Sequence, residues 1–271
     1  MEEQVKNQFA VVTGASKGLG KAFAIELAHR QFNVILVSLP GQDLKQLSDW
    51  IAKEYQVQCF YYETDFSLDD NIRGLANWLN DNFDISVLIN NAGIGGSMRF
   101  EEADVDYVNT IIQVNAKAPA ILTHQLLPNL KRQRQSYVLN VSSIAAFSPI
   151  GYKTVYPASK AFIHSFTRSL RVELKGTNVF VSVVNPGAMA TNNQACVRIK
   201  KQGIFGKLTL QKPERVARLC VNKLFKRKAV IMVTPVTWFL SVIIPLWLKV
   251  PFLTWVVKRE LKHEKSIYNR G

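Results

Sequence analysis

An apolar run, a glycine-rich loop and a helical stretch follow one another within the first thirty residues, and this order constrains the fold more than any other feature. Residues 9–13 are apolar and β-branched, as buried strands are. The loop Gly14-Ala15-Ser16-Lys17-Gly18-Leu19-Gly20 comes next, and apolar residues at helical spacing continue to Arg30. Glycines let a backbone approach a pyrophosphate closely, and a helix N-terminus attracts its negative charge. The unit predicts a dinucleotide site, although such a loop alone also serves as an ordinary tight turn.

The same alternation of apolar runs and helical stretches continues along the chain. Strands are predicted at 9–13, 33–38, 58–62, 87–90, 136–142, 180–185 and 229–233, with helices around 18–30, 43–55, 68–82, 104–130, 152–175 and 213–227. Such alternation favours an α/β fold with a parallel sheet covered by helices on both faces. At 271 residues without a repeat or linker, one domain over 1–271 is expected. Ligands of such sheets bind at the carboxyl ends of the strands.

Tyr156 and Lys160 stand four residues apart in Tyr-Pro-Ala-Ser-Lys, a spacing that places both on one face of a helix. An ammonium beside a phenol stabilises the phenolate, so we expect a lowered pKa for Tyr156. Ser143 ends the apolar run before them, where its hydroxyl is placed to hold a carbonyl oxygen; Ser142 competes for this role. Pro157 is compatible with a helix that begins near Val155. These groups predict proton transfer during reduction of a ketone by hydride.

With these motifs in order, the chain resembles the short-chain dehydrogenase/reductase family of the classical type. The resemblance spans about residues 9–233, and Ser143 precedes Tyr156 by the usual thirteen residues. Within the family, the chain resembles the branch of the long-chain 3-ketoacyl and 17-beta-hydroxysteroid reductases. The matching elements are Thr13-Gly14-x-x-x-Gly18-x-Gly20, Asp65, Asn90-Asn91-Ala92-Gly93, Asn115, Ser143, Tyr156-x-x-x-Lys160 and Pro186-Gly187 followed by Thr191. The resemblance implies a Rossmann-like, three-layer fold with seven strands in the order 3-2-1-4-5-6-7.

The resemblance also implies roles for individual residues. Asn115, Ser143, Tyr156 and Lys160 form the expected catalytic set, in which Asn115 perturbs its helix and holds a water that connects Lys160 to solvent. Lys160 is also expected to bond the nicotinamide ribose. The expected cofactor-binding set is Gly14, Ser16, Lys17, Gly18, Leu19, Gly20, Asp65, Phe66, Asn91, Ala92, Gly93, Tyr156, Lys160, Pro186, Gly187 and Thr191. Asp65 has a second interpretation as the N-cap of the following helix, and Ser143 and Asn115 have structural interpretations as a strand-end cap and a helix contact.

The residues after the second predicted strand bear on the choice of nicotinamide. An NAD enzyme places an acid there to bond the ribose hydroxyls, but this chain has Ser38 and Leu39, and its first acid is Asp43. Lys17 is placed to pair with a 2′-phosphate. NADP is therefore predicted over NAD, although the additional Arg common after this strand is absent.

Charge is concentrated at one end of the chain. The net charge is +14, and residues 1–197 contain equal numbers of basic and acidic residues, so 198–271 carry all of it. This distribution describes a neutral body with a basic end and argues against nucleic acid as the partner. The acidic N-terminus predicts no secretory signal, and the isolated Cys59, Cys196 and Cys220 predict free thiols in a reducing compartment and no metal site.

The C-terminal region combines apolar and basic residues. Residues 229–248 contain no charge, but Pro235, Pro245 and Pro251 argue against one unbroken helix. We expect a strand, then a broken apolar hairpin in an extension over 234–271. Trp238, Trp247 and Trp255 beside Lys and Arg suit an anionic membrane surface. A subunit contact, added core packing and a transmembrane helix are the alternatives.

Residues 192–212 are expected to form an apolar and basic substrate lid. The predicted function is therefore NADP-dependent reduction of a lipophilic ketone, such as a 3-oxoacyl or steroid substrate. The predicted protein is a cytoplasmic homo-oligomer that associates peripherally with a membrane. The rival hypotheses are a membrane-surface or partner-binding sensor that keeps the nucleotide fold, and a nucleic-acid binder, which lacks a polar stacking platform.

Overall fold

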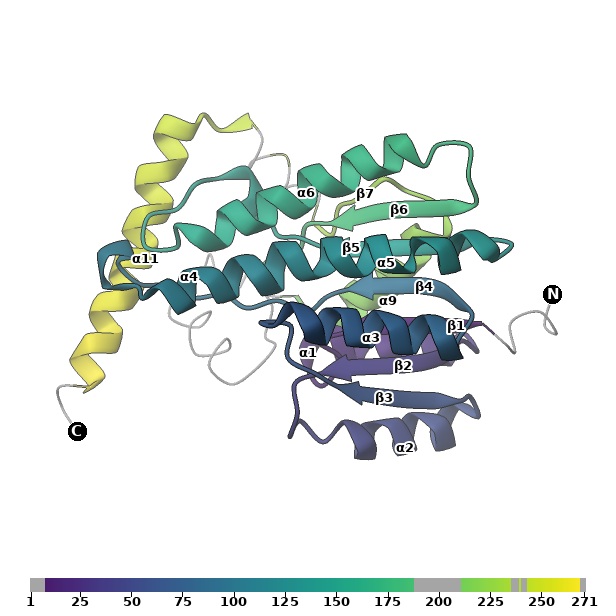
Figure 1. Cartoon of the computed structure of the whole chain (residues 1–271). Coiled ribbons are helices and arrows are strands. Elements are labelled where there is room, and N and C mark those ends of the chain that lie inside the picture. Colours follow the sequence, from purple (N-terminus) through teal and green to yellow (C-terminus); the bar gives the residue numbers. More distant parts are fainter. Residues whose placement is uncertain (1–7, 188–210, 235–238, 240–242, 269–271) are drawn as a thin grey trace.

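Seven parallel strands form the centre of the molecule, and helices cover both faces of the sheet (Figure 1). The computed structural model describes residues 8–187, 211–234, 239 and 243–268. The strands are β1 Phe9–Thr13, β2 Asn33–Ser38, β3 Cys59–Glu63, β4 Ile85–Asn90, β5 Ser136–Val141, β6 Val179–Val184 and β7 Val230–Ile231. Their order is β3-β2-β1-β4-β5-β6-β7, which confirms the predicted fold class. Each strand lies within three residues of its predicted bounds.

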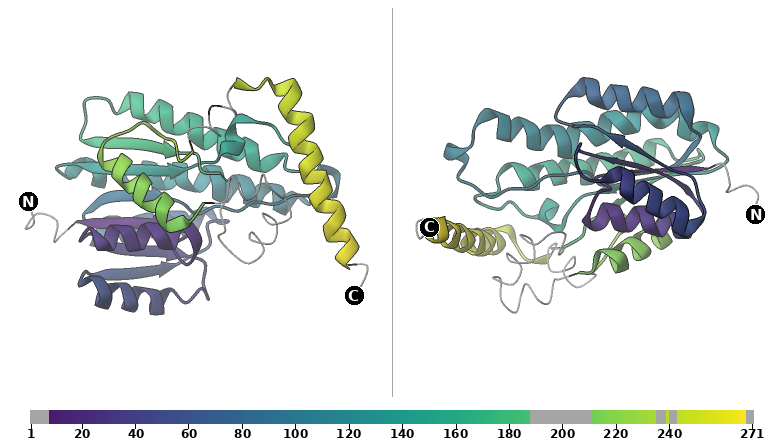
Figure 2. Two further views of the ribbon diagram at one scale, coloured as in Figure 1. Left: turned by 180° about the vertical axis from the view of Figure 1, so that it is seen from behind. Right: turned by 90° about the horizontal axis from the view of Figure 1, so that it is seen from below.

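The helices form two layers. The main helices are α1 Gly18–His29, α2 Leu44–Tyr55, α3 Asp69–Asn82, α4 Val105–Ile112, α5 Ala118–Arg132, α6 Val155–Glu173, α9 Pro213–Phe225 and α11 Leu246–Tyr268. In Figure 1, α3, α5 and α6 cover the front of the sheet, and the view from behind in Figure 2 shows α1 and α9 on the opposite face. Short 3₁₀ helices, η1 Phe100–Glu102 and η3 Ile144–Phe147, lie in connections, and η2 Gln113–Lys117 is a π-helix.

Alternating residues of each strand divide the core into two clusters. Ala10 and Val12 of β1 face α1 and α9, whereas Phe9 and Val11 face α3 and α5. This follows from the two-residue period of a strand whose faces are both covered. Because every residue of β1 and β4 is buried, both strands form a rigid base for the loops that follow them.

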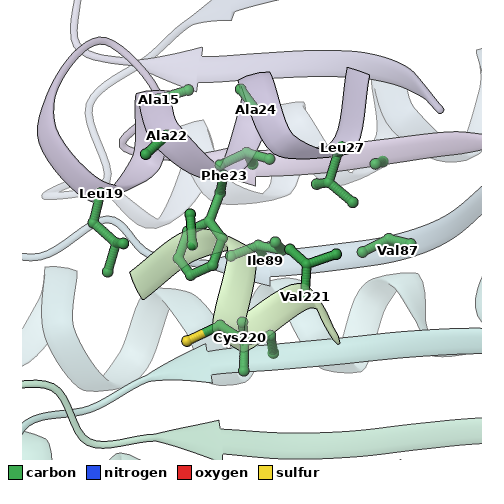
Figure 3. Packing of buried hydrophobic residues seen from close by; sticks show 14 of the residues in the cluster. Ala15, Leu19, Ala22, Phe23, Ala24, Leu27, Val87, Ile89, Cys220 and Val221 are labelled. Carbon is green, nitrogen blue, oxygen red and sulfur yellow. The ribbon is translucent and has the colours of Figure 1, made fainter. Parts of the chain in front are cut away.

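The packing of α1 on the sheet fixes the helix that follows the glycine loop. Phe23 and Leu27 are fully buried among residues of β4 and α9, including Ile89 and Val221 (Figure 3). Burial of each such side chain stabilises the fold by about 1.5–3 kcal/mol. The N-terminus of α1 is therefore held at the carboxyl edge of the sheet.

Two predicted helical regions differ from the structure. The helix expected over 104–130 is divided into α4, the π-helix and α5. The break expected at Pro251 is wrong, because α11 continues through Pro251 for 23 residues, and residues 235–238 and 240–242 of the expected hairpin lie outside the described residues. Proline lacks the N–H that would bond to the carbonyl of the residue four positions earlier. Here that carbonyl belongs to Trp247, and because Pro251 and Trp247 are both exposed, water can solvate it. Among the described residues, none of the helices has the length and apolar character needed to cross a membrane.

Candidate active site

The glycine loop makes a tight turn against the end of β4. Gly14 and Gly18 have φ values of +66° and +57°, in the left-handed region that favours glycine. A Cβ on Gly20 would lie 2.0 Å from the Gly14 carbonyl oxygen and 2.6 Å from Asn91 Nδ2. Only glycine fits at position 20, so the backbone approaches closely where the helix N-terminus begins. No side chain caps this end of α1 within the described residues, which leaves its N–H groups available to a pyrophosphate.

Hydrogen bonds join the glycine loop to the segment after β4. Thr13 Oγ1 accepts from the backbone N–H groups of Asn91 and Ala92, both at 3.0 Å. Asn91 Nδ2 donates to the carbonyl oxygens of Thr13 at 2.9 Å and Gly14 at 3.3 Å. Two sequence motifs that lie nearly eighty residues apart thus form one wall, as their positions after neighbouring strands predict.

Asn115 lies in the π-helix and is almost completely buried. Its Oδ1 accepts from the Ile94 N–H, and its Nδ2 donates to the Ile94 carbonyl, both at 2.8 Å, and to Ser159 Oγ at 3.1 Å. The extra residue of a π turn directs this amide away from the regular helix path. Asn115 therefore fastens the segment after β4 to α6, and its predicted role in holding a water stays a prediction.

The structure distinguishes the two candidate serines. Ser142 is buried, and its hydroxyl donates to the Lys160 carbonyl oxygen at 2.7 Å. Ser143 Oγ accepts from the Ala145 N–H at 3.1 Å, which caps η3, and the same hydroxyl lies near enough to Tyr156 to oppose the increase in its pKa. Ser143 thus combines the expected cap with the expected position beside the phenol, and Ser142 holds the helix.

Tyr156 and Lys160 lie in the first two turns of α6, which begins at Val155 as Pro157 predicts. Burial raises the pKa of Tyr156 above its usual 10, and the hydrogen bond with Ser143 opposes this increase. The expectation of a lowered phenol pKa is therefore wrong for this structure. The Lys160 ammonium lies 6.0 Å from the Tyr156 ring centroid and donates to the Val141 carbonyl at 3.0 Å. Burial is the larger cause of the shift at Tyr156.

Lys160 itself is strongly perturbed. The residue is 5% exposed, and burial lowers the pKa of its ammonium from 10.5 to about 8. A Cβ on Gly93 would lie 3.1 Å from Lys160 Nζ and 3.1 Å from Asn115 Oδ1. Gly93 therefore lets the backbone pack closely against the ammonium and the Asn115 amide. An ionisable group perturbed by burial, among convergent polar groups, is typical of active sites.

A buried polar chain beneath these groups was not predicted from the sequence. Asn90 Nδ2 donates to Thr123 Oγ1 at 2.9 Å and to Asn140 Oδ1 at 2.8 Å, and Asn140 Nδ2 donates to Thr167 Oγ1 at 2.9 Å. The chain links α5, β4, β5 and α6. Asn90 and Asn140, each near the end of an apolar run, were its sequence signals.

The adenosine end of the predicted site contains a further acid. Lys17 Nζ donates to Gln42 Oε1 at 3.4 Å, and Ser38 Oγ donates to Ser16 Oγ at 3.0 Å. Glu63, at the end of β3, accepts from the Gly41 N–H at 3.2 Å. An acid is expected only directly after the second strand, so no local pattern points to Glu63. Glu63 ends the third strand, and only the pairing of the strands brings it beside this loop.

Asp65 and Phe66 follow β3 at the same edge. Asp65 Oδ1 accepts from the Ser67 N–H at 2.8 Å, and the Asp65 carbonyl accepts from Asn71 Nδ2 at 2.9 Å. Because Leu68 occupies the N-cap position of α3, the interpretation of Asp65 as that cap is wrong. The side chain of Phe66 is buried in the core, so a cofactor contact at Phe66 would use its backbone.

A family model described as short chain dehydrogenase matches residues 8–202. The chain is a short-chain dehydrogenase. Very-long-chain 3-oxoacyl-CoA reductase of Mus musculus is 34% identical over 188 residues, which cover 68% of this chain and 60% of that protein. The dehydrogenase thus spans about 60% of the length of this relative.

Solved structures resemble the dehydrogenase in fold. A structure described in terms of 7beta-hydroxysteroid dehydrogenase stereoselectivity has a TM-score of 0.82 at 21% identity, covering 93% of this chain and 98% of that one. A metagenomic short-chain oxidoreductase in complex with NADP has a TM-score of 0.69 at 26% identity, covering 84% of this chain and 96% of that one.

The nicotinamide end of the dehydrogenase site is described in part. Pro186 is buried at the end of β6, and its carbonyl accepts from the Ile144 N–H at 3.1 Å. Pro186 and Gly187 thereby lie beside the residue after Ser143, as their motif predicts. Thr191 and the predicted lid up to 210 lie outside the described residues.

Proposed function

We propose that this short-chain dehydrogenase is an NADP(H)-dependent reductase of a lipophilic carbonyl compound. The observation that carries the proposal is the proximity of the Ser143 and Tyr156 hydroxyls, with the buried Lys160 one turn further along α6. The glycine turn and the uncapped start of α1 fit the pyrophosphate of a dinucleotide that extends from Lys17 toward Lys160. The rival sensor hypothesis is not favoured, because a non-catalytic fold has no need for a buried ammonium that costs stability.

The site residues have defined roles in this reaction. A bound reduced nicotinamide supplies the hydride for the carbonyl carbon. Tyr156 donates its proton to the carbonyl oxygen, and Ser143 donates a hydrogen bond to the same oxygen as negative charge develops on it. Lys160 stabilises the phenolate that remains, because transfer of the proton creates an opposite charge beside the ammonium. In the reverse direction Tyr156 accepts the proton of an alcohol.

We propose a 3-oxoacyl thioester as the first substrate to test, with NADPH as the preferred donor. The substrate is suggested by the name of the Mus musculus relative and by the apolar and basic residues of 192–212. NADPH is suggested by Lys17 beside Gln42 and by the NADP complex of the metagenomic oxidoreductase. Glu63 is the feature that opposes this choice, since a carboxylate disfavours a 2′-phosphate.

We expect oxidation of NADPH when the purified protein is mixed with long-chain 3-oxoacyl thioesters, and slower oxidation with short-chain ones.

Lys17→Met removes one phosphate partner, so kcat/KM for NADPH should fall about tenfold while that for NADH changes little. Glu63→Gln should raise kcat/KM for NADPH. Initial-rate assays with both donors measure these ratios. A wild-type preference for NADH contradicts the proposed cofactor. Absence of turnover with every 3-oxoacyl and steroid ketone contradicts the proposed substrate class.

We further propose that the extension over 234–271 contacts an anionic membrane surface. Large apolar side chains are exposed along α11, and Trp247, Phe252 and Trp255 are 74%, 51% and 57% exposed. Lys258 and Arg259 follow on the same helix, and Arg259 lies 5.7 Å from the Trp255 ring centroid. Aromatic rings with adjacent cations suit the boundary between headgroups and acyl chains.

Sedimentation with vesicles tests this surface. We expect the protein to bind phosphatidylcholine vesicles that contain phosphatidylserine, and to lose binding on Trp247→Ser/Phe252→Ser/Trp255→Ser. Trp50→Ser is the control, because Trp50 is exposed on α2, away from this surface. Equal binding by the triple variant contradicts the proposal. If the triple variant instead dissociates an oligomer in solution, the surface is the subunit contact of the predicted homo-oligomer.

A further inference from the structure

The segment between Ser143 and Tyr156 connects the two hydroxyls of the active site. Residues 144–154, called here the connecting segment, contain η3 and a turn that ends where α6 begins. The N–H of Ile144 bonds to Pro186, and the Tyr152 carbonyl accepts from the Met98 N–H at 2.8 Å. Any displacement of this segment changes the distance between Ser143 and Tyr156, because each hydroxyl stands at one of its ends.

Two hydrogen bonds attach α11 to the middle of the connecting segment. Lys249 Nζ donates to the Phe147 carbonyl at 3.1 Å, and the Gly151 N–H donates to Thr254 Oγ1 at 2.9 Å. These contacts join residues 102 and 103 positions apart in the chain. Figure 1 shows α11 standing across the end of the molecule where the strands end.

The inner face of α11 is shaped for this contact. Lys249 is 8% exposed although it carries a charge, and Val257 on the same face is 6% exposed. A Cβ on Gly151 would lie 2.6 Å from Thr254 Cγ2, so the turn can approach the helix only with glycine at this position. On the other side of the segment, the Phe147 ring packs edge to face against the His164 ring of α6, with 4.9 Å between the ring centroids. The segment is thus held between α6 and α11.

We infer that Lys249 and Thr254 are positioning residues, through which the C-terminal helix holds Ser143 and Tyr156 in the geometry needed for proton transfer. Their effect passes through the Phe147 carbonyl and the Gly151 N–H, which fix the connecting segment at two points. Catalysis depends steeply on such placement, since a displacement of about 1 Å far from the reacting atoms can cost about 100-fold in rate.

The test compares Lys249→Met/Thr254→Val with the rescue variant Lys249→Arg/Thr254→Ser in the full chain. Met and Val keep the apolar volume but remove the donor and the acceptor, whereas Arg and Ser restore them. We expect kcat for ketone reduction to fall about tenfold in the first variant, while the Kd for NADPH stays at the wild-type value, and the rescue variant to recover most of the rate. Lys53→Met is the control, because Lys53 is exposed on α2, away from the connecting segment.

Rates are expressed per NADPH-binding site, so that a fraction of unfolded protein does not lower them. A primary isotope effect with deuterated NADPH should increase in the Met/Val variant, because imperfect alignment slows the chemical step. A purely structural role of α11 would lower the melting temperature but leave the rate per site and the isotope effect unchanged, and that result would overturn the inference.

The kinetic readout rests on the proposed function, so a second measurement is independent of it. Hydrogen exchange at the Gly151 amide, followed in peptides that cover 144–154, should be faster in the Met/Val variant than in wild type and in Lys53→Met. If exchange increases but no ketone is reduced by wild type, the attachment holds and the proposed substrate is wrong. Unchanged exchange contradicts the attachment itself.

Discussion

Tyr156→Phe is expected to lower kcat/KM for ketone reduction by about 1,000-fold or more while NADPH binding is retained. Phe keeps the ring against Gly95, where an added Cβ would lie 3.5 Å from it, but has no proton to donate. Loss of a positioned general acid costs about 100- to 10,000-fold, and the contact with Ser143 is also lost. Fluorescence titration with NADPH separates binding from chemistry, and turnover near the wild-type rate would reject Tyr156 as the acid.

The two neighbouring serines supply a matched control for this prediction. Ser143→Ala removes the hydroxyl beside Tyr156 and should lower kcat about 100-fold. Ser142→Ala removes a buried bond to the Lys160 carbonyl, so it should reduce stability by about 1 kcal/mol and change kcat far less. If Ser142→Ala proves the more damaging to kcat at full NADPH occupancy, the assignment of the two hydroxyls is reversed.

The direction of the Tyr156 shift determines the pH dependence of the two reactions. Its pKa is raised, so the phenol stays protonated throughout the neutral range and reduction has its acid available there. Oxidation of the alcohol needs the phenolate and should accelerate as the pH rises. Initial rates in both directions between about pH 6 and 9, in the range near neutrality, distinguish this behaviour from that of an already ionised tyrosine.

The features that depend on local patterns were predictable from the sequence. β-branched runs mark the buried strands, and parallel strands place their following residues on one edge, so Thr13, Asn91 and Ser143 were expected there together. Pro157 correctly indicated where α6 begins. Each of these inferences needs only the period of a strand, the rule for ligand position, or the missing N–H of proline.

The features that were missed depend on tertiary packing. Helical periodicity runs through 104–130, and only the resemblance implied a perturbation at Asn115; its bonds to Ile94 on another segment favour the π turn. The direction of the Tyr156 shift depends on a balance between burial and a charge, which spacing alone does not provide. α11 is stabilised by contacts of Lys249 and Thr254 with residues about a hundred positions away, so no local pattern overrides the signal of Pro251.

The buried ammonium of Lys160 predicts an unusual dependence of stability on pH. Its pKa is lowered from 10.5 to about 8 by burial in the folded chain. Below pH 8 the Lys160 ammonium is charged in both the folded and the unfolded chain, so the folded chain bears the full desolvation cost of the buried charge. Between about 8 and 10.5 the unfolded chain binds more protons than the folded chain, so the contribution of Lys160 to stability rises with pH. The difference between the two pKa values corresponds to about 3 kcal/mol.

Lys160→Met removes this titration, so the free energy of unfolding of wild type relative to Lys160→Met should rise by about 3 kcal/mol between pH 7 and 10.5. At pH 7 the variant should be at least as stable as wild type, because removing the charge offsets the loss of the bond to the Val141 carbonyl, which is worth about 1–3 kcal/mol. It should nevertheless be nearly inactive. Urea unfolding of the cofactor-free protein measures the difference, with the exposed Lys258→Met as the control that should show no such trend. A constant difference across this range would mean that Lys160 has an ordinary pKa in the folded chain. Its ammonium would then be in contact with water, which contradicts its burial beside Gly93 and Asn115.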